Sequence, residues 1–456
     1  MSEFLWLLGL YIVIGSVIVL VVMRKKQSQE DYFIGSRKIH WIVTALTYAA
    51  TTYSAFMMVG LVGLSYSSGI GAMIFELIYL AATIILLTLY GKRIWRLGHQ
   101  HGYVSPMEML GGRYGHKTAA VGAGVAFLAL IPYASVQVIG LALIFNNYGI
   151  GFVTGVTIAA VIICVWAFLG GLRGVAITDA LQGAFMMLVA VGVLAWTGNT
   201  FQGFELSTFP NKVWTPVFFI NLTLPWSFFA LTNPQVVQRL FIIREEAGIR
   251  KMIIFFAIFG LIYTVIVTFI GFGAKFGTLE GVLPQIADRD TVIVELMGRM
   301  GAWLSLPLGL SIIFASVSTS NSIILTLSSM VTRDIFREKE RAVVGRVFTV
   351  VLTLLVFLFA LLRPDYIVEL SVATSRILLV FLPLFWGLFH GRKGAERTGL
   401  TVLLGGAVCA VLTSVFGLAL SSVYTFIAVF VLYFLASRLE PEGPAPAVKA
   451  ENGTKQ

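Results

Sequence analysis

Apolar segments of about twenty residues recur along the whole chain, and this repetition most constrains its fold. A helix of that length spans the hydrocarbon core of a bilayer, and hydrophobic residues make up 58% of the chain whereas charged residues make up 12%. The sequence therefore predicts an all-α, polytopic membrane protein. We expect about thirteen transmembrane helices, near residues 3–23, 41–65, 69–90, 118–147, 151–171, 176–197, 215–234, 252–274, 300–331, 343–362, 366–389, 400–420 and 421–438.

Lysine and arginine are distributed unevenly between the loops that alternate along these spans. The cluster Arg24-Lys25-Lys26 follows the first span, and further basic loops on the same side include Arg239 in the loop after the seventh span. Since basic loops remain in the cytoplasm, we expect a multi-pass protein of the cell membrane with its N-terminus outside and its C-terminus in the cytoplasm. The net charge of +10 reflects this bias and does not indicate nucleic-acid binding.

The stretch Ser311–Asp334, which begins inside the predicted span 300–331, carries small hydroxyl residues on a single helical face. Ala315, Ser318, Thr319 and Ser322 follow one another at i, i+3, i+4 and i+7. Hydroxyl groups inside a bilayer need partners. The pattern alone leaves three interpretations open: bonds back to carbonyls of the same helix, a small-residue packing face between helices, or coordination of a hard cation such as Na⁺.

Two predicted spans contain the residues of an interrupted helix. In the second span, the polar run Thr51–Ser54 precedes several glycines, although membrane helices also tolerate glycine without a break. In the seventh span, Pro225 and Pro234 flank a polar stretch, and each proline removes a backbone hydrogen bond. We expect both helices to be broken.

Each interrupted span opens a group of five spans. Because five is odd, the second group enters the membrane from the opposite side, which is the arrangement of an inverted repeat with ligands at the midplane. We divide the chain into a first span with an inner loop (1–40), two five-helix repeats (41–197 and 215–389), two peripheral C-terminal spans (390–438) and a disordered cytoplasmic tail (439–456).

Among the ionisable residues within predicted spans, we single out three, because a charge inside a bilayer is costly and indicates a functional site. Glu76 lies about two turns into the third span, Asp179 just inside the sixth and Arg376 two turns into the eleventh. Simpler roles remain open for each residue. Glu76 could be protonated or reach the interface, Asp179 could cap a helix N-terminus, and Arg376 could pair with Glu369 or with the carboxylate of a solute.

The chain resembles the sodium:solute symporter family over nearly its whole length, up to about Leu439. The strongest motif is Ser318-Thr319-x-x-Ser322 followed by Arg333-Asp334-Ile-Phe336. The other motifs, in order, are Asp31-Tyr32-Phe33-Ile-Gly35-Ser36-Arg37, Ser54-Ala55, Arg113-Tyr114-Gly115, Gly170-Gly171 with Thr178-Asp179, and Gln238-Arg239. The resemblance implies a leucine-transporter-type 5+5 inverted repeat and sodium-coupled import of a small organic solute by alternating access, not an enzyme.

The same resemblance implies where the sodium ions and the solute bind. The principal sodium site would use Ala50, Tyr53, Ala315, Ser318 and Thr319. A second sodium ion would be held by Asp179, Ser318, Asn321 and Ser322. The solute would contact Thr52, Phe56, Met57, Glu76, Gln137, Trp226, Phe229 and Arg376. Phe56 and Met57 stand where sugar carriers have polar groups, so we favour an amino acid or a monocarboxylate over a hexose.

The main alternative is a proton-coupled symporter of the same fold in which Glu76 or Asp179 carries the proton. A channel fits less well because pores are usually built from rings of like groups, and a sensor would need a soluble signalling domain. The expected partners are the solute, the sodium ion and the lipid bilayer, with no nucleic acid and with function as a monomer.

Overall fold

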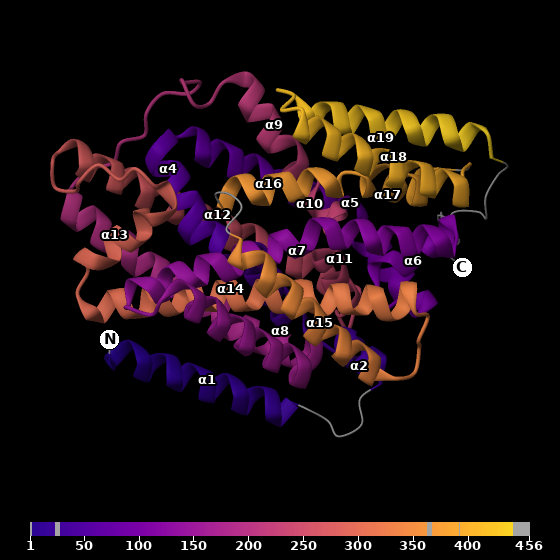
Figure 1. Ribbon diagram of the computed structural model, residues 1–456, viewed down its shortest axis with the longest axis horizontal. Helices are drawn as coiled ribbons and strands as arrows, with labels where there is room; N and C mark the ends of the chain where they lie inside the picture. Colours follow the sequence, from indigo (N-terminus) through magenta and orange to yellow (C-terminus); the bar gives the residue numbers. More distant parts are fainter. Residues whose placement is uncertain (1, 23–27, 363–366, 392, 441–456) are drawn as a thin grey trace, which may run out of the picture.

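Helices make up almost all of the computed structural model of the protein, which describes residues 2–22, 28–362, 367–391 and 393–440 (Figure 1). Within these residues no β-strand is present, and Ile39 and Ile243 form an isolated bridge. The predicted all-α fold is confirmed. The cluster Arg24-Lys25-Lys26 and the predicted tail from residue 441 onward lie outside the described residues.

The helices follow one another along the chain with short connections. The first are α1 (Ser2–Val22), α2 (Gln29–Ile34), α3 (Trp41–Thr52), α4 (Val62–Ser68), α5 (Gly71–His101), α6 (Pro106–Tyr114), α7 (His116–Asn147) and α8 (Phe152–Phe201). The remaining ones are α9 (Pro216–Ser227), α10 (Phe229–Thr232), α11 (Pro234–Phe241), α12 (Ala247–Leu279), α13 (Val292–Arg299), α14 (Ala302–Met330), α15 (Ala342–Leu361), α16 (Ile367–Leu378), α17 (Phe381–His390), α18 (Glu396–Val415) and α19 (Ser421–Arg438). Two π-helical segments, η2 (Phe56–Leu61) and η4 (Val331–Ile335), and two 3-10 turns, η1 (Gly35–Arg37) and η3 (Arg289–Thr291), join some of them.

The number of spans differs from the expected thirteen. In the described chain, ten helices are long and apolar enough to cross a membrane, or eleven if the bent pair around residue 54 counts as one span. Two predicted spans, 151–171 and 176–197, both fall within α8, which leaves helical geometry at Gly171 (φ 53°, ψ −164°). The seventh predicted span, 215–234, is shared among short helices. The count of thirteen therefore remains a prediction.

Both predicted interruptions are present. The second span bends by 48° between α3, which ends at Thr52, and the segment that begins at Phe56. The seventh span is divided at Phe228 and again at Asn233, directly before Pro234. Proline cannot donate a backbone hydrogen bond and its ring disfavours the preceding helical turn, so Pro234 occupies the first turn of α11.

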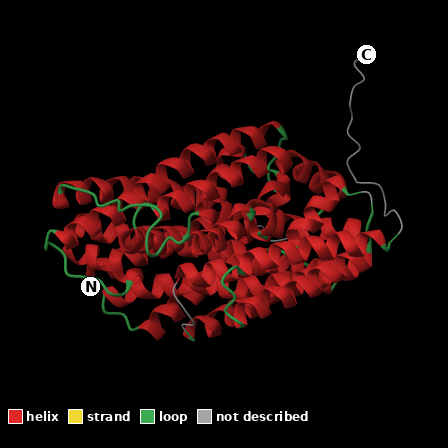
Figure 2. Ribbon diagram, turned by 90° about the horizontal axis from the view of Figure 1, so that it is seen from above, coloured by secondary structure: helices red, strands yellow, loops and turns green. Residues whose placement is uncertain are grey.

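The long helices run side by side along the long axis of the molecule (Figure 2). α14 lies at the centre, whereas α1 lies along one edge and α18 and α19 lie along the opposite edge (Figure 1). In an apolar 18-residue window of the span Ala302–Ile335, which α14 and η4 form, 94% of the residues are buried, compared with 22% in α1. Polar groups on α14 are therefore enclosed by protein and must find partners there.

Candidate functional site

The break after α3 exposes backbone groups at the centre of the molecule. Tyr53 has a ψ of 82°, which turns its carbonyl away from the direction of the helix. The amide of Ala55 donates to Oε1 of Gln137 on α7 at 3.2 Å. A side chain from a neighbouring helix thus replaces a lost helical bond, and Gln137, predicted as a solute ligand, supports the break.

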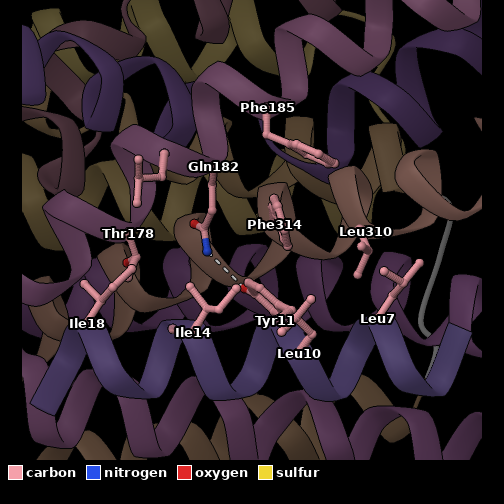
Figure 3. Close-up of a pocket in the computed structure, with 12 residues that line it drawn as sticks. Leu7, Leu10, Tyr11, Ile14, Ile18, Thr178, Gln182, Phe185, Leu310 and Phe314 are labelled. Atoms are coloured by element: carbon pink, nitrogen blue, oxygen red, sulfur yellow. Dashed lines mark hydrogen bonds between the residues drawn. The ribbon is translucent and has the colours of Figure 1, made fainter.

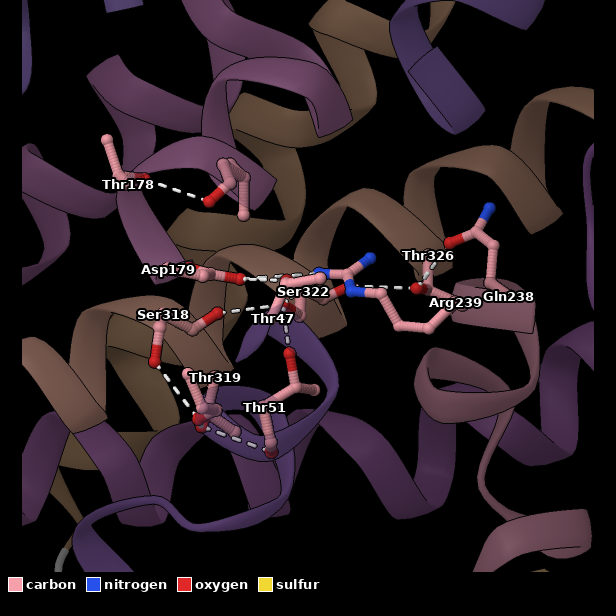
Figure 4. Close-up of polar contacts among 12 residues, drawn as sticks. Thr47, Thr51, Thr178, Asp179, Gln238, Arg239, Ser318, Thr319, Ser322 and Thr326 are labelled. Atoms are coloured by element: carbon pink, nitrogen blue, oxygen red, sulfur yellow. Dashed lines mark hydrogen bonds and ion pairs between the residues drawn. The ribbon is translucent and has the colours of Figure 1, made fainter. Parts of the chain in front are cut away.

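The hydroxyl face of α14 meets the end of α3 at this break (Figure 4). The hydroxyl oxygens of Ser318 and Thr319 lie 3.1 Å and 3.2 Å from the carbonyl oxygen of Ala50. Ser318 also donates to the carbonyl of Ala315 at 3.0 Å, and Thr319 to that of Thr51 at 3.3 Å. Two hydroxyls and three carbonyls are thereby gathered in the interior, and such neutral oxygens can replace the water shell of a cation.

Four of the five predicted sodium ligands belong to this group of oxygens. The fifth, Tyr53, is the first residue of the adjacent break, and its ring packs against Phe256 and Tyr263 of α12 with centroids 5.6 Å and 5.7 Å away. Bonds within α14 explain only part of the hydroxyl stripe. Ser322 and Thr326 each donate to the carbonyl four residues earlier at 2.8 Å. The hydroxyl groups of the stripe also contact α3 or α11, as Ser318 and Thr319 do with Ala50, Ser322 with Thr51 and Thr326 with Gln238.

A buried charge pair lies beside these oxygens (Figure 4). Asp179 on α8 is fully buried; its Oδ2 accepts a hydrogen bond of 2.5 Å from Thr47 on α3 and lies 3.8 Å from Nη2 of Arg239 on α11. Arg239 also donates to Ser322 on α14, whose hydroxyl lies 3.0 Å from that of Thr51. Asp179 lies well inside α8, so it does not cap a helix N-terminus. Its contacts instead link α8 to α3 and α11.

The second predicted sodium site coincides with this charge pair. Asp179 and Ser322 both contact the guanidinium group of Arg239. Oδ1 of Asp179 and Oδ1 of Asn321 are buried and make no hydrogen bond within the described residues. Because Arg239 already neutralises the carboxylate, a second sodium ion at this place would compete with the guanidinium group for it.

Gln238 extends the contact between α11 and α14. Its Oε1 accepts a hydrogen bond of 2.6 Å from Thr326, and its Nε2 donates to Oγ of Ser329 at 3.0 Å and to the carbonyl of Val104 at 2.9 Å. These hydrogen bonds hold the short helix α11 against the C-terminal half of α14. The assignment of Arg239 to a loop was wrong, because its side chain is fully buried within α11. The motif Gln238-Arg239 was the signal that could have identified both residues.

Aromatic rings from both broken segments and from α5 gather around Trp226. Phe56 and Phe229 stack on Trp226 with centroids 4.7 Å and 5.5 Å away. Tyr79 meets the same ring edge-on at 5.1 Å, and Phe75 at 5.9 Å. The structure thus brings together three predicted solute residues and adds Phe75 and Tyr79, which the sequence did not single out.

Several buried polar atoms on α3, α5, α7 and α9 make no hydrogen bond within the described residues. Both carboxyl oxygens of Glu76 are of this kind within the described chain, as are Oγ1 of Thr52, the hydroxyl of Tyr133 and Nε1 of Trp226. Each such atom costs about 1–3 kcal/mol unless something pairs with it. Glu76 is fully buried, so it does not extend to the membrane interface. These atoms could pair with the polar groups of a solute. Met57, another predicted solute residue, is also buried.

Arg376 contacts the peripheral helices instead of joining this aromatic group. Its Nε donates to Ser422 of α19 at 3.2 Å, and its Nη1 donates to Ser414 of α18 at 2.7 Å. We therefore leave Arg376 out of the solute site. The side chain of Glu369, its suggested partner, lies outside the described residues.

A separate cavity of about 270 Å³ lies between α1, α8 and α14 (Figure 3). Its walls are mainly aliphatic and aromatic, and Nε2 of Gln182 donates to the hydroxyl of Tyr11 at 3.0 Å on one side. None of the predicted sodium or solute residues lines this cavity.

Known proteins with similar sequences and structures are transporters. The profile of the sodium:solute symporter family matches residues 32–399. The sodium/pantothenate symporter of Escherichia coli (strain K12) is 27% identical over 442 residues, which cover 89% of each chain. The sodium/proline symporter of the same organism is 24% identical over 371 residues, 75% of this chain and 73% of the relative. A solved Na⁺-coupled sialic acid symporter, substrate-bound and outward-open, superposes with a TM-score of 0.79 at 18% identity, covering 97% of this chain and 98% of that one.

Proposed function

Because the chain belongs to the sodium:solute symporter family, we propose that it imports a small organic solute together with sodium by alternating access, and that the solute is an amino acid. The observation that carries this proposal is the meeting of a broken helix with a hydroxyl-bearing helix. The carbonyl oxygen of Ala50 lies 3.1 Å and 3.2 Å from the hydroxyls of Ser318 and Thr319. The proposed orientation places the N-terminus outside and the C-terminus in the cytoplasm.

Sodium would bind among the neutral oxygens of Ala50, Ala315, Ser318 and Thr319. The two hydroxyls now donate to carbonyls, and they can rotate so that their lone pairs face an ion instead. The ion would then link α3, in the first proposed repeat, to α14, in the second. Because coupling between two ligands is reciprocal, sodium that fixes this contact would favour solute binding, and bound solute would raise the affinity for sodium.

The membrane potential would contribute to transport because the ion carries charge. One elementary charge that crosses toward a negative interior gains about 2.3 kcal/mol per 100 mV. In the proposed cycle, release on the inner side would require α11 to part from α14, which would break the contacts of Gln238 and Arg239 with α14. These contacts would keep the inner side closed until both ligands are bound.

The surroundings of Trp226 favour an amino acid over a plain monocarboxylate. Glu76 lies between Phe75 and Tyr79 in the chain, and both of these rings contact Trp226. A carboxylate and aromatic ring faces both attract an ammonium group. The carboxylate of Glu76 would repel a solute that carries only a carboxylate. Among the relatives, one symporter is named for proline and another for pantothenate.

Proton-coupled symport is the second candidate, and Glu76 is the observation that favours it. Its buried carboxyl oxygens make no hydrogen bond within the described chain, so this group could exchange a proton without breaking a protein contact. Asp179 suits that role less well, because Thr47 and Arg239 hold its carboxylate.

Transport into proteoliposomes separates the two candidates. A melting-temperature screen of amino acids and short carboxylates, with sodium or choline present, first identifies a solute that stabilises the purified protein. We then expect an inward sodium gradient at constant pH to drive uptake of this solute, and an inward proton gradient in choline medium to drive none. Equal uptake with the proton gradient alone would refute sodium coupling in favour of the alternative.

A further inference from the structure

A groove with a basic end separates α5 from α12 on the lipid-facing side of the molecule. It encloses about 560 Å³ and is lined mainly by aliphatic side chains, with Lys92 and Arg250 among the lining residues. Ile254 and Ile258, also in its wall, have exposed fractions of 51% and 57%. In a membrane-spanning protein, surfaces of this kind face lipid rather than water.

The two helices run antiparallel, so both cations lie at the same end of the groove. Gly91 of α5 approaches Ile249 near the start of α12, whereas Leu80 approaches Gly260, about three turns farther along α12. Eight residues separate Arg250 from Ile258, which corresponds to roughly 12 Å along the helix axis. The groove therefore has a charged end near the helix ends and an apolar end deeper in the membrane.

The charge of this end is not cancelled by the neighbouring acid. Glu246 receives two hydrogen bonds of 2.8 Å from Arg96, which hold the pKa of its carboxyl below the usual value. Lys92 reaches the same carboxylate only at 4.0 Å, and 53% of its side chain is exposed. Arg250 makes no hydrogen bond or ion pair with any described residue, and Lys251 beside it lies over the ring of Trp41. The net charge at this end of the groove is therefore positive.

From this arrangement we infer that the groove binds one anionic phospholipid. Its phosphate would contact Lys92 and Arg250, since a guanidinium group pairs readily with phosphate oxygens, and an acyl chain would lie along Ile84, Ile254 and Ile258. Basic pockets between membrane helices are sites for acidic headgroups. The proposed orientation places this end in the cytoplasmic leaflet, where acidic lipids produce a negative surface potential, although the chemistry of the groove does not depend on it.

The bound lipid would also stabilise α12, the helix that packs beside the proposed sodium site. Phe256 and Phe259 of α12 stack on Tyr53 with centroids 5.6 Å and 6.0 Å away, and they neighbour the groove residues Ile254 and Ile258 in the chain. An acyl chain bound between α5 and α12 would therefore support α12, the helix against which Tyr53 packs at the break after α3.

The test is a lipid titration of the full-length protein in an uncharged detergent. Phosphatidylglycerol, phosphatidylcholine and inorganic phosphate are added separately, and melting temperature and lipid retained in native mass spectrometry are recorded. We expect phosphatidylglycerol alone to be retained and to raise the melting temperature. The double substitution Lys92→Gln/Arg250→Gln should raise the half-saturating lipid concentration roughly 30-fold, as expected for two surface cations. Arg250→Gln alone, which removes no hydrogen bond or ion pair with a described residue, should show a smaller rise.

Two further variants separate a built groove from diffuse attraction. Lys393→Gln removes the same charge from a loop that lies elsewhere in the sequence and is also predicted to be cytoplasmic, and it should leave lipid binding unchanged. Ile254→Trp fills the groove without changing its charge and should abolish lipid retention while the melting temperature in phosphatidylcholine stays near that of the wild type. Equal retention of phosphatidylcholine, an equal effect of inorganic phosphate, an equal loss in Lys393→Gln, or normal binding by Ile254→Trp would each overturn the proposal.

Discussion

Replacing Thr319 with alanine tests the proposed sodium site most directly. Oγ1 of Thr319 lies 3.2 Å from the carbonyl of Ala50 and 3.3 Å from that of Thr51, so it stands where α14 meets the break in α3. A hydrogen-bond-type contact with a charged group is worth about 1.5–3 kcal/mol. At 1.4 kcal/mol for each factor of ten, loss of this oxygen should raise the half-saturating sodium concentration roughly 10- to 100-fold.

The sodium-induced rise in the melting temperature of the purified protein measures this change without a known solute. Choline replaces sodium at constant ionic strength during the titration. Thr319→Ser keeps the hydroxyl and should restore most of the affinity. Ser316→Ala is a matched control, because Ser316 is equally buried on the same helix but donates to the carbonyl of Ile312 at 2.9 Å. The reasoning fails if Thr319→Ala titrates like the wild type, or if Ser316→Ala weakens sodium binding equally.

Three further substitutions address the charge pair and the solute site. Asp179→Asn or Arg239→Gln alone leaves a buried charge without its partner and should destabilise the protein by about 3–5 kcal/mol. Thermal melts of both single variants and of the double variant measure this loss. If the losses of stability in the two single variants add up in the double variant, the pair is not coupled. Glu76→Gln should retain the sodium dependence of uptake but weaken binding of solutes with an ammonium group, and counterflow that loses its sodium dependence would contradict the assignment. Trp226→Ala removes the ring on which Phe56 and Phe229 stack, so it should weaken solute-induced stabilisation far more than Trp226→Phe does, and equal effects would argue against a stacking role.

The sequence was sufficient where the relevant signal is local. The face formed by Ala315, Ser318 and Thr319 follows from helical periodicity, and the break after Thr52 follows from polar residues within an apolar run. Neither pattern reveals that Ala50 is the partner, because contact between residues 268 positions apart depends on how the helices pack. The family resemblance supplied that pairing.

The depth of a charged residue was harder to predict. Arg239 lies at the end of an apolar run and was assigned to a loop, yet the division of the chain at Asn233 starts a new buried helix that carries it into the interior. Arg376 was expected beside the solute, but the hydroxyls of Ser414 and Ser422 on the peripheral helices bind it. In both cases, hydropathy describes the segment and says nothing of the direction in which one side chain points.

The brevity of α10 has a consequence for the timing of transport. Four residues, Phe229–Thr232, are too few to sustain a cooperative hydrogen-bond ladder, so this turn keeps its shape through neighbours such as Tyr79 and Trp226, which pack on Phe229. When those rings separate, its backbone amides become free to take up deuterium from solvent. The rate of deuterium uptake at Phe229–Thr232 would therefore report how often the protein opens, even in the absence of a solute.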